Sequence, residues 1–461
     1  MKNFIKFLKT DIKIINSYFL FAIILIILIS VGYTSYALFS FTKTSSNVIE
    51  GKVGKIEKKP NAPVLASNMI PVYYDETAET WKKADLANLN NTYKWYNYNN
   101  GMWANAVTVT SSSRSKYLNA SIGTSISMND ITTMWVWIPR FNAVTPSNYN
   151  GGTKDNPGAI DVTFVKQNEP AIDAFTFGDK QLSGFWYAKF EVSHSTLASS
   201  TTNNNLGCAT TTCSNANGII IKPNVKSLRY NNISNFFFAS RSMEQTGNSF
   251  GFVSTEVDTH MSKNNEWGAV AYLTQSIYGR CSNSTNCTEV GINNNSNYIT
   301  GYGAPAGSSS SVTNGAYNTD LGKDASTTGT IYGIYDMSGG AYEYVMGVSA
   351  DTNGKPRSGY SSSSNSGFTG MLNDGTTYTR IAFPDSKYYN LYTDDSSYTG
   401  HALTETARWY NDDEYFVESS FPWFLRGGIY HDGIDAGVFT FSNSSGSSDS
   451  YYSSHFAITN E

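Results

Sequence analysis

The sequence predicts an α+β protein that is rich in loops and built mainly from short strands. Aromatic and β-branched residues alternate with polar ones in short runs, and Asn- and Gly-containing turns separate these runs. Stretches rich in Ser, Thr and Asn divide them further, at residues 199–205, 307–311 and 358–366. An Ala- and Leu-containing stretch at 268–278 has helical character. We therefore expect small sheets and a helix joined by long surface loops.

Composition excludes two classes of protein. With 15% charged and 14% aromatic residues, the chain of 461 residues is too apolar to be disordered. Its formal net charge of −5, with no basic stripe after the N-terminal region, argues against nucleic acid as a partner. The order of patterns along the chain divides it into an export or anchor segment (1–41), a linker (42–68), an aromatic β-rich region (69–170) and a larger domain (171–461).

The first forty residues predict export. Four lysines, at positions 2, 6, 9 and 13, precede an apolar core from Tyr18 to Ile29, which has the length of a signal-peptide core. Small residues at Ser35 and Ala37 make cleavage after Ala37 the first interpretation. Because residues 30–41 also lack charge, an uncleaved membrane anchor is the alternative. Either way, we expect an extracellular or cell-surface location.

The region 69–170 contains the first strand-like runs, at 71–75, 94–98, 103–109 and 134–141. Pro139 should end the last of these runs or place it at a sheet edge. The Trp and Tyr residues of this region fit a half-buried core, and a face for stacking sugars is the alternative.

The stretch Gly329 to Gly347, GTIYGIYDMSGGAYEYVMG, concentrates polar groups around a Gly-Gly turn. Asp336 and Glu343 stand on either side of that turn, whose backbone carbonyls can point inward. Two carboxylates and carbonyl oxygens form the ligand set that calcium prefers. The simpler interpretation is a strand, a turn and a strand whose acids face water.

This stretch resembles the G-L-Y-D/N-M-x-G-N-x-W-E-W signature of the formylglycine-generating enzyme family, which has a C-type-lectin-like fold. The family's calcium-site positions correspond here to the side chains of Asp336 and Glu343 and to the backbone oxygens of Gly339 and Ala341. The resemblance therefore implies a structural calcium ion. The sequence departs from the signature in having Gly340 for Asn, and Tyr342 and Tyr344 for Trp.

Three further segments resemble the same family in the same order. Phe185 to Ser193 (FWYAKFEVS) is similar to its f-x-i-x-K-Y-E-V-T strand, and Asn264 to Trp267 (NNEW) to the start of its L-P-T-E-A-E-W helix. Phe424 to Gly428 (FLRGG) is similar to its V-L-R-G-G-S-W strand. The ordered set covers more than half of the chain and implies a C-type-lectin-like domain of this type in residues 171–461.

The family's chemistry is not matched by the cysteines. Formylglycine generation uses a redox-active, copper-binding cysteine pair near the C-terminal end of the domain, whereas no cysteine follows Cys287 here. An even number of cysteines in an exported chain favours disulfides, and the pairs Cys208 with Cys213 and Cys281 with Cys287 would each close a small polar loop. A zinc site made from all four is the competing interpretation.

The histidines and the adjacent acidic residues also give little evidence for a catalytic site. A related branch of the family uses three histidines to bind iron, but the five histidines here form no H-x-x-x-H or similar cluster. Asp412, Asp413 and Glu414 could supply paired carboxylates, although adjacent acids in a Tyr-rich loop are usually just solvated. We therefore predict a protein without enzymatic activity, with an oxidoreductase of the same superfamily as the alternative.

The C-terminal segment has the composition of a binding surface. An apolar strand is expected at 436–441, followed by Ser, Asn, Asp and Tyr residues up to His455, where rigid aromatics and adaptable polar groups alternate. It is similar to the ligand-facing segment of variable receptor-binding proteins diversified by retroelements, and a polar loop without a partner is the alternative. The predicted ligand-binding residues are Tyr430, His431, Asp432, Asp435, Ser442, Asn443, Asp449, Tyr451, Tyr452 and His455.

Together these features predict an exported surface protein of the adhesin or receptor type, which binds a protein or glycan ligand and contacts the membrane only if the N-terminal segment is uncleaved. A structural surface-fibre subunit, which would associate with itself through a sheet edge, is a further alternative.

Overall fold

The largest element of the fold is an antiparallel sheet of seven strands, in the spatial order β12-β20-β9-β4-β3-β1-β2. The computed structural model describes residues 59–460, apart from 198–205, 209–211, 358–367 and 372–377. In spatial order the strands are β12 (Val257–Met261), β20 (Phe456–Asn460), β9 (Gly184–Ala188), β4 (Ile131–Pro139), β3 (Asn105–Val109), β1 (Ile70–Asp75) and β2 (Thr80–Lys83). Because β4 pairs with β9, the regions predicted as 69–170 and 171–461 share this sheet.

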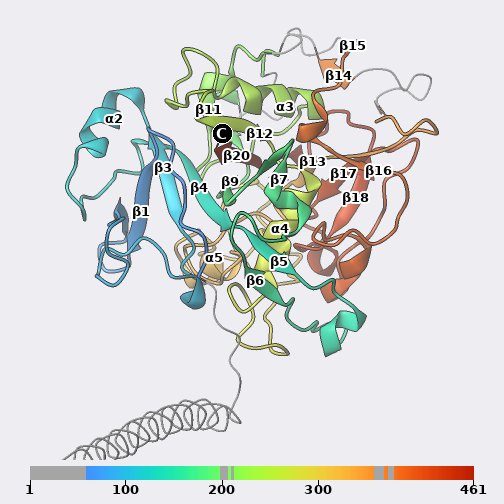
Figure 1. Ribbon diagram of the computed structural model, residues 1–461, viewed down its shortest axis with the longest axis horizontal. Coiled ribbons are helices and arrows are strands. Elements are labelled where there is room, and N and C mark those ends of the chain that lie inside the picture. The colour runs from blue at the N-terminus through green and yellow to red at the C-terminus, as the bar shows by residue number, and fades with distance from the viewer. Residues whose placement is uncertain (1–58, 198–205, 209–211, 358–367, 372–377, 461) are drawn as a thin grey trace, which may run out of the picture. The chain divides into compact units, whose positions relative to one another are not determined.

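A second sheet of five strands contains the Gly329 to Gly347 stretch and the C-terminal segment. Its strands are β16 (Asn390–Tyr392), β13 (Tyr342–Ser349), β17 (Trp423–Arg426), β18 (Phe441–Ser444) and β19 (Tyr452–Ser453). Strand β13 lies between β16 and β17 and also pairs with β19. Figure 1 shows β1, β3 and β4 on one side of the molecule and β16, β17 and β18 on the other. The architecture is thus α+β and dominated by sheets, as predicted.

Four two-stranded sheets and four α-helices complete the described part. The small sheets pair β5 (Phe141–Ala143) with β6 (Val162–Phe164), β7 (Thr176–Phe177) with β8 (Lys180–Gln181), β10 (Ser193–His194) with β11 (Ile219–Ile220), and β14 (Phe368–Met371) with β15 (Tyr378–Ile381). The helices are α2 (Ser111–Leu118), α3 (Ile233–Ser242), α4 (Asn264–Thr274) and α5 (Asp320–Asp324). The prediction placed only α4: the helical stretch was expected at 268–278, and the resemblance of Asn264 to Trp267 to the family's helix start matches where α4 begins.

One aromatic core joins both large sheets. Among its fully buried side chains are Trp135 and Trp186 of the seven-stranded sheet and Trp423 of the five-stranded sheet. The aromatic residues predicted in region 69–170 belong to this core, since Trp95, Tyr98 and Trp103 are all buried. The core interpretation is therefore confirmed over a sugar-stacking face.

Several predicted elements differ. Residues 94–98 form no strand, because Asn97 and Met102 exchange backbone hydrogen bonds around a tight turn that ends at Gly101. The strand expected at 436–441 begins only at Phe441, because the carboxylate of Asp412 accepts the Phe439 N–H (2.9 Å) and holds the preceding residues in turns. Pro139 ends β4, as expected.

The last ten residues of the predicted linker are bound to the domain. The Nε1 of Trp186 donates to the Val64 carbonyl (2.7 Å), and the Asn61 amide donates to the Val165 carbonyl (2.8 Å). Residues 59–461 pack as one unit. The export or anchor segment, the linker up to residue 58 and the polar loops 199–205 and 358–366 lie outside the described residues. None of the described helices has the length and hydropathy needed to span a membrane.

Both predicted disulfides are present, Cys208 with Cys213 and Cys281 with Cys287. All four cysteines of the chain are therefore oxidised, and the zinc interpretation is wrong.

Candidate functional site

The four segments that resemble the formylglycine-generating family meet inside the protein. Glu343 of β13 lies directly opposite Arg426 of β17, and the Gly339 N–H donates to the Gly427 carbonyl (2.9 Å). The ring of Trp267, in α4, lies 5.5 Å from the Arg426 guanidinium. Glu191, which follows β9, accepts the Ala341 N–H (2.8 Å). Residues more than 200 positions apart are thus brought into one interior cluster.

Three carboxyl groups in this cluster are buried without a cationic partner. Burial raises the pKa of Asp336, Glu343 and Glu191, and the negative charge of Asp336 raises the pKa of the other two further. His455 lies against Glu343 through a hydrogen bond from its Nδ1, and burial lowers the pKa of this imidazole to about 4. At neutral pH the imidazole is therefore uncharged and does not balance the carboxyl groups.

Asp336 is the most completely hydrogen-bonded of the three. Its backbone adopts a left-handed conformation (φ 65°), and its carboxylate accepts the Gly301 N–H (2.8 Å) and the Asn293 side-chain amide (2.8 Å). The Glu191 N–H makes a weaker contact (3.3 Å). Glu343 contrasts with it, because its Oε1 is buried and has no hydrogen-bond partner among the described residues.

The predicted calcium ligands can be tested against this geometry. Asp336, Gly339, Ala341 and Glu343 do surround one turn, and buried carboxyl groups with an unpartnered oxygen fit a hard cation in charge and donor type. Both Asp336 oxygens are already occupied by N–H donors. Within the described ranges, no group of three or more His, Cys, Asp or Glu side chains is arranged to hold a metal ion.

On the other side of the same turn lies an exposed face. The Tyr430 N–H donates to the Gly340 carbonyl (2.9 Å), so the turn positions the residues that follow β17. We call the residues Tyr430, His431, Asp432, Ile434 and Tyr451 the Tyr430 face. Ile434 and Tyr451 are 59% and 41% exposed, so this part of the chain presents an apolar and an aromatic side chain to solvent.

The rings of this face form a continuous series. The Tyr430 ring centre lies 4.6 Å from that of His431, which lies 6.1 Å from that of Tyr451. Below them the buried Tyr298 packs edge-on against Tyr430 at 5.1 Å. The guanidinium of Arg229 covers the Tyr298 ring at 3.7 Å and also hydrogen-bonds to the Ser450 carbonyl. The exposed rings therefore rest on a fixed base.

Acidic groups border the rings. Burial raises the pKa of Asp432, whose carboxylate accepts the Ile429 N–H (2.9 Å). Burial and the neighbouring Asp432 together raise the pKa of the Tyr342 hydroxyl. Asp435 belongs to the one-turn helix Gly433–Asp435, and its carbonyl accepts the Asp413 N–H (3.0 Å). The face thus combines apolar rings with carboxylates, a mixture suited to polar ligands.

Four further predicted ligand-binding residues lie in strands or turns beside the Tyr430 face, and we do not count them as part of it. Asp449 caps the turn before Tyr451, and Tyr452 pairs with Tyr342 between β19 and β13. Ser442 and Asn443 lie in β18, where the Asn443 amide donates to the Phe416 carbonyl (2.7 Å).

His455 does not lie on the face: it is fully buried, stacked on Tyr187 at 5.3 Å and bonded to Glu343. The correction has a simple cause, since His455 directly precedes β20 in the interior of the large sheet.

Sequence reasoning missed residues that come from distant segments. Tyr298 and Arg229 support the face, and Asn293 and Glu191 complete the interior cluster. Glu191 lies in a segment that resembles the family, which is a signal for its importance. No local pattern distinguishes the other three from ordinary loop residues.

No family model matches the sequence, and no curated protein matches it. Among solved structures, the chain is similar to Treponema denticola variable protein 1, with 13% identity and a TM-score of 0.26 over 71% of this chain and 95% of that one. It is similar to PvdO from Pseudomonas aeruginosa, with 9% identity and a TM-score of 0.26 over 71% of this chain and 94% of that one. It is also similar to the Major Tropism Determinant I1 variant, with 11% identity and a TM-score of 0.28 over 84% of this chain and 94% of that one. At these TM-scores the likeness carries no conclusion about fold or function.

Proposed function

We propose that this chain is an exported cell-surface protein that binds a protein or glycan ligand through the Tyr430 face. The observation that carries the proposal is the series of exposed rings at His431 and Tyr451, supported from below by Tyr430, Tyr298 and Arg229. Rigid aromatic side chains give contact area at a low cost in conformational entropy, and here the rings of His431 and Tyr451 lie next to each other on one exposed face.

The domain that presents this face is, in our proposal, a C-type-lectin-like domain of the formylglycine-generating type. Support comes from the meeting of all four resembling segments around Glu191, Asp336, Glu343 and Arg426. We propose further that a structural calcium ion is held near Asp336 and Glu343, where it would brace the turn that carries Tyr430. Export through the N-terminal segment, cleaved or retained as an anchor, belongs to the same proposal.

The experiment compares binding of the full-length chain and its variants to printed arrays of glycans and of extracellular proteins. His431→Ala with Tyr451→Ser removes the two exposed rings while leaving the supporting Tyr430 and Tyr298 in place. Tyr93→Ser is the matched control, because Tyr93 is similarly exposed (42%) but lies in the segment between β2 and β3.

We expect a ligand that wild type and the Tyr93 variant bind equally and that the double variant binds at least tenfold more weakly. A ligand that the double variant binds as well as wild type would place the binding surface elsewhere and contradict the proposal. Unchanged melting temperatures show that the variants are folded.

A further inference from the structure

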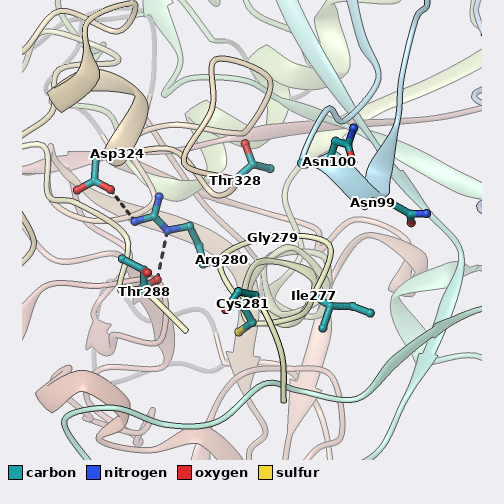
Figure 2. Close-up of a pocket in the computed structure, with 11 residues that line it drawn as sticks. Asn99, Asn100, Ile277, Gly279, Arg280, Cys281, Thr288, Asp324 and Thr328 are labelled. Atoms are coloured by element: carbon teal, nitrogen blue, oxygen red, sulfur yellow. Dashed lines mark hydrogen bonds and ion pairs between the residues drawn. The ribbon is translucent and has the colours of Figure 1, made fainter. Parts of the chain in front are cut away.

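A separate pocket of about 380 Å³ lies where three distant segments meet, and Figure 2 shows it. One wall is the turn of Asn99 and Asn100, another is the loop after α4 that begins at Ile277, and the third follows α5 from Asp324 to Thr328. The volume falls in the range of small-ligand sites. None of the residues lining it belongs to the Tyr430 face.

The base of the pocket is Arg280, whose side chain is only 5% exposed. Its Nη2 donates to the Asp324 carboxylate (2.7 Å) and to the Glu289 carbonyl (2.7 Å), and its Nε donates to the Thr288 carbonyl (3.2 Å). In Figure 2 the third guanidinium nitrogen, Nη1, makes no drawn contact with the other lining residues. A guanidinium held in this way keeps its remaining donors in one direction.

Glycine at position 329 leaves space beside that nitrogen. A Cβ atom at Gly329 would lie 2.4 Å from Nη1, so any side chain there would displace the guanidinium. Gly329 also has a left-handed backbone (φ 66°), which favours glycine at this position.

The other walls carry two side-chain amides and a carboxylate that can form hydrogen bonds with a ligand. Asn99 and Asn100 are exposed, and their side-chain amides make no hydrogen bond within the described part of the chain. Asp324 uses one carboxylate oxygen for Arg280 and is 43% exposed. Each of these planar groups can bond two adjacent hydroxyls of a ligand. Ile277, 51% exposed, adds an apolar contact beside the Cys281–Cys287 disulfide.

The walls are already ordered. The disulfide closes the loop of the second wall, and the Ser282 N–H donates to the Asn286 carbonyl (2.9 Å). The Thr330 hydroxyl bonds to the Gly101 carbonyl (3.0 Å) and ties the first wall to the third. The Trp103 Nε1 donates to the Tyr278 carbonyl (2.8 Å) and ties the first wall to the second. A ligand would therefore not bear the entropic cost of ordering these loops.

We propose that this pocket is a second ligand site, which binds a neutral saccharide unit. Amides, a carboxylate and a guanidinium around one apolar side chain can pair with the adjacent hydroxyls of a sugar ring and cover its C–H surface. The ligand is neutral because Asp324 already balances the charge of Arg280, so an anionic group would lie against a carboxylate.

The test is saturation-transfer NMR of the full-length chain in a detergent without a sugar headgroup. The probes are the methyl glycosides of glucose, galactose, mannose and N-acetylglucosamine, and the anionic comparator is the methyl glycoside of galacturonic acid, with its carboxyl group unesterified and ionised at neutral pH. The pocket variants are Asn99→Ala with Asn100→Ala, and Asp324→Ala. The controls are Asn90→Ala, which removes an exposed amide elsewhere, and Tyr451→Ser on the Tyr430 face.

We expect at least one neutral glycoside to bind wild type, to lose at least fivefold in signal in both pocket variants and to keep its signal in both controls. Three results would overturn the proposal: no neutral glycoside binds wild type, the pocket variants keep the signal, or the anionic comparator binds more strongly than every neutral sugar. A signal lost only in Tyr451→Ser would also overturn it while supporting the Tyr430 face, so the two proposals fail separately.

Discussion

Lys189 is a buried amine that holds two segments together. Its Nζ donates to the carbonyls of Ile331 (2.7 Å) and Gly333 (2.6 Å), and the rings of Trp81 and Tyr335 lie 5.3 Å away. Burial lowers the pKa of this amine well below its usual value. The lysine thus fixes the chain just before the Asp336 turn.

Lys189→Met should lower the free energy of unfolding by about 2–4 kcal/mol, because it leaves two buried carbonyls without a donor while relieving the cost of burying a charge. Urea denaturation measures this change. The control is Lys323→Met, whose amine pairs with the exposed Glu76 and with no other residue of the described ranges, and which should change stability by less than about 1 kcal/mol. If both substitutions lowered the free energy of unfolding equally, the buried hydrogen bonds of Lys189 would contribute no more to stability than a surface ion pair.

His260 should make stability depend on pH above neutrality. Burial alone would lower its pKa, but the carboxylates of Glu266 (2.9 Å) and Asp258 outweigh burial and raise the pKa to about 9, from 6.5. A raised pKa means that the stabilisation is complete below pH about 6.5 and is lost as the pH rises through about 9.

The measurement is the free energy of unfolding of wild type and His260→Gln between pH 6 and 10. The decline from pH 6.5 to 9 should be clearly smaller in this variant. His431→Gln, at an exposed position, should follow wild type. A decline of the same size in His260→Gln would assign it to other groups.

At the residue scale, the sequence located Asp336 and Glu343 but not their surroundings. Their spacing around a Gly-Gly turn is a local signal, whereas the approach of Glu191 and Asn293 depends on the tertiary fold. His455 shows the converse. Its Ser- and Tyr-rich neighbours have the composition of a surface loop, but the following strand runs into the middle of a sheet.

Among the elements, the turn at Gly339 and Gly340 is restricted in two ways. Both residues have left-handed backbones, with φ of 73° and 75°. A Cβ atom at Gly339 would lie 2.5 Å from the Asn293 carbonyl oxygen, and one at Gly340 would lie 2.5 Å from Glu191 Oε1. The turn therefore needs glycine for its conformation and also for space.

Gly339→Ala can be compared with Gly354→Ala, because Gly354 has nearly the same φ (71°) but no atom within 4 Å of its Cβ position. Gly354→Ala should cost about 1–2 kcal/mol for the left-handed backbone alone. Gly339→Ala should cost about 1–3 kcal/mol more, from the collision with backbone. Denaturant titration of both variants measures the difference, and equal costs would mean that the turn can relax around an added methyl group.

At this scale the sequence predicted strands better than helices. Short apolar and aromatic runs marked β1, β3 and β4, whereas β9 and β17 were expected from their resemblance to strands of the family. Helix α3 was missed because its short sequence, ISNFFFASRS, has three consecutive Phe residues that interrupt the polar side, and nearly all of its polar side chains are buried together with the apolar ones. Helix α5, with five residues, is too short for a period to be visible.

For the whole molecule, the proposed calcium ion predicts a measurable link between metal content and stability. The purified protein should contain about one equivalent of calcium, and its melting temperature should fall when a chelator is added. The cause is the loss of a counter-charge to the buried carboxyl groups of Asp336, Glu343 and Glu191. Mass spectrometry and thermal melting in calcium and in chelator make the measurement.

Glu343→Gln is the matched variant for this experiment, since it keeps the shape of the side chain and removes its charge. Its melting temperature should no longer respond to the chelator. A wild-type protein without bound calcium, or with stoichiometric copper or iron, would contradict the proposal.

The position of β20 has a consequence for how the chain acquires its structure. Residues 456–460 lie between β9 and β12, and those two strands do not pair with each other. The large sheet therefore stays in two pieces until residues synthesised some 200 positions after β12 arrive to join them. A chain that emerges N-terminus first, from a ribosome or an export channel, can close this sheet only after residues 456–460 have emerged, and it remains vulnerable to proteases and to mispairing until then.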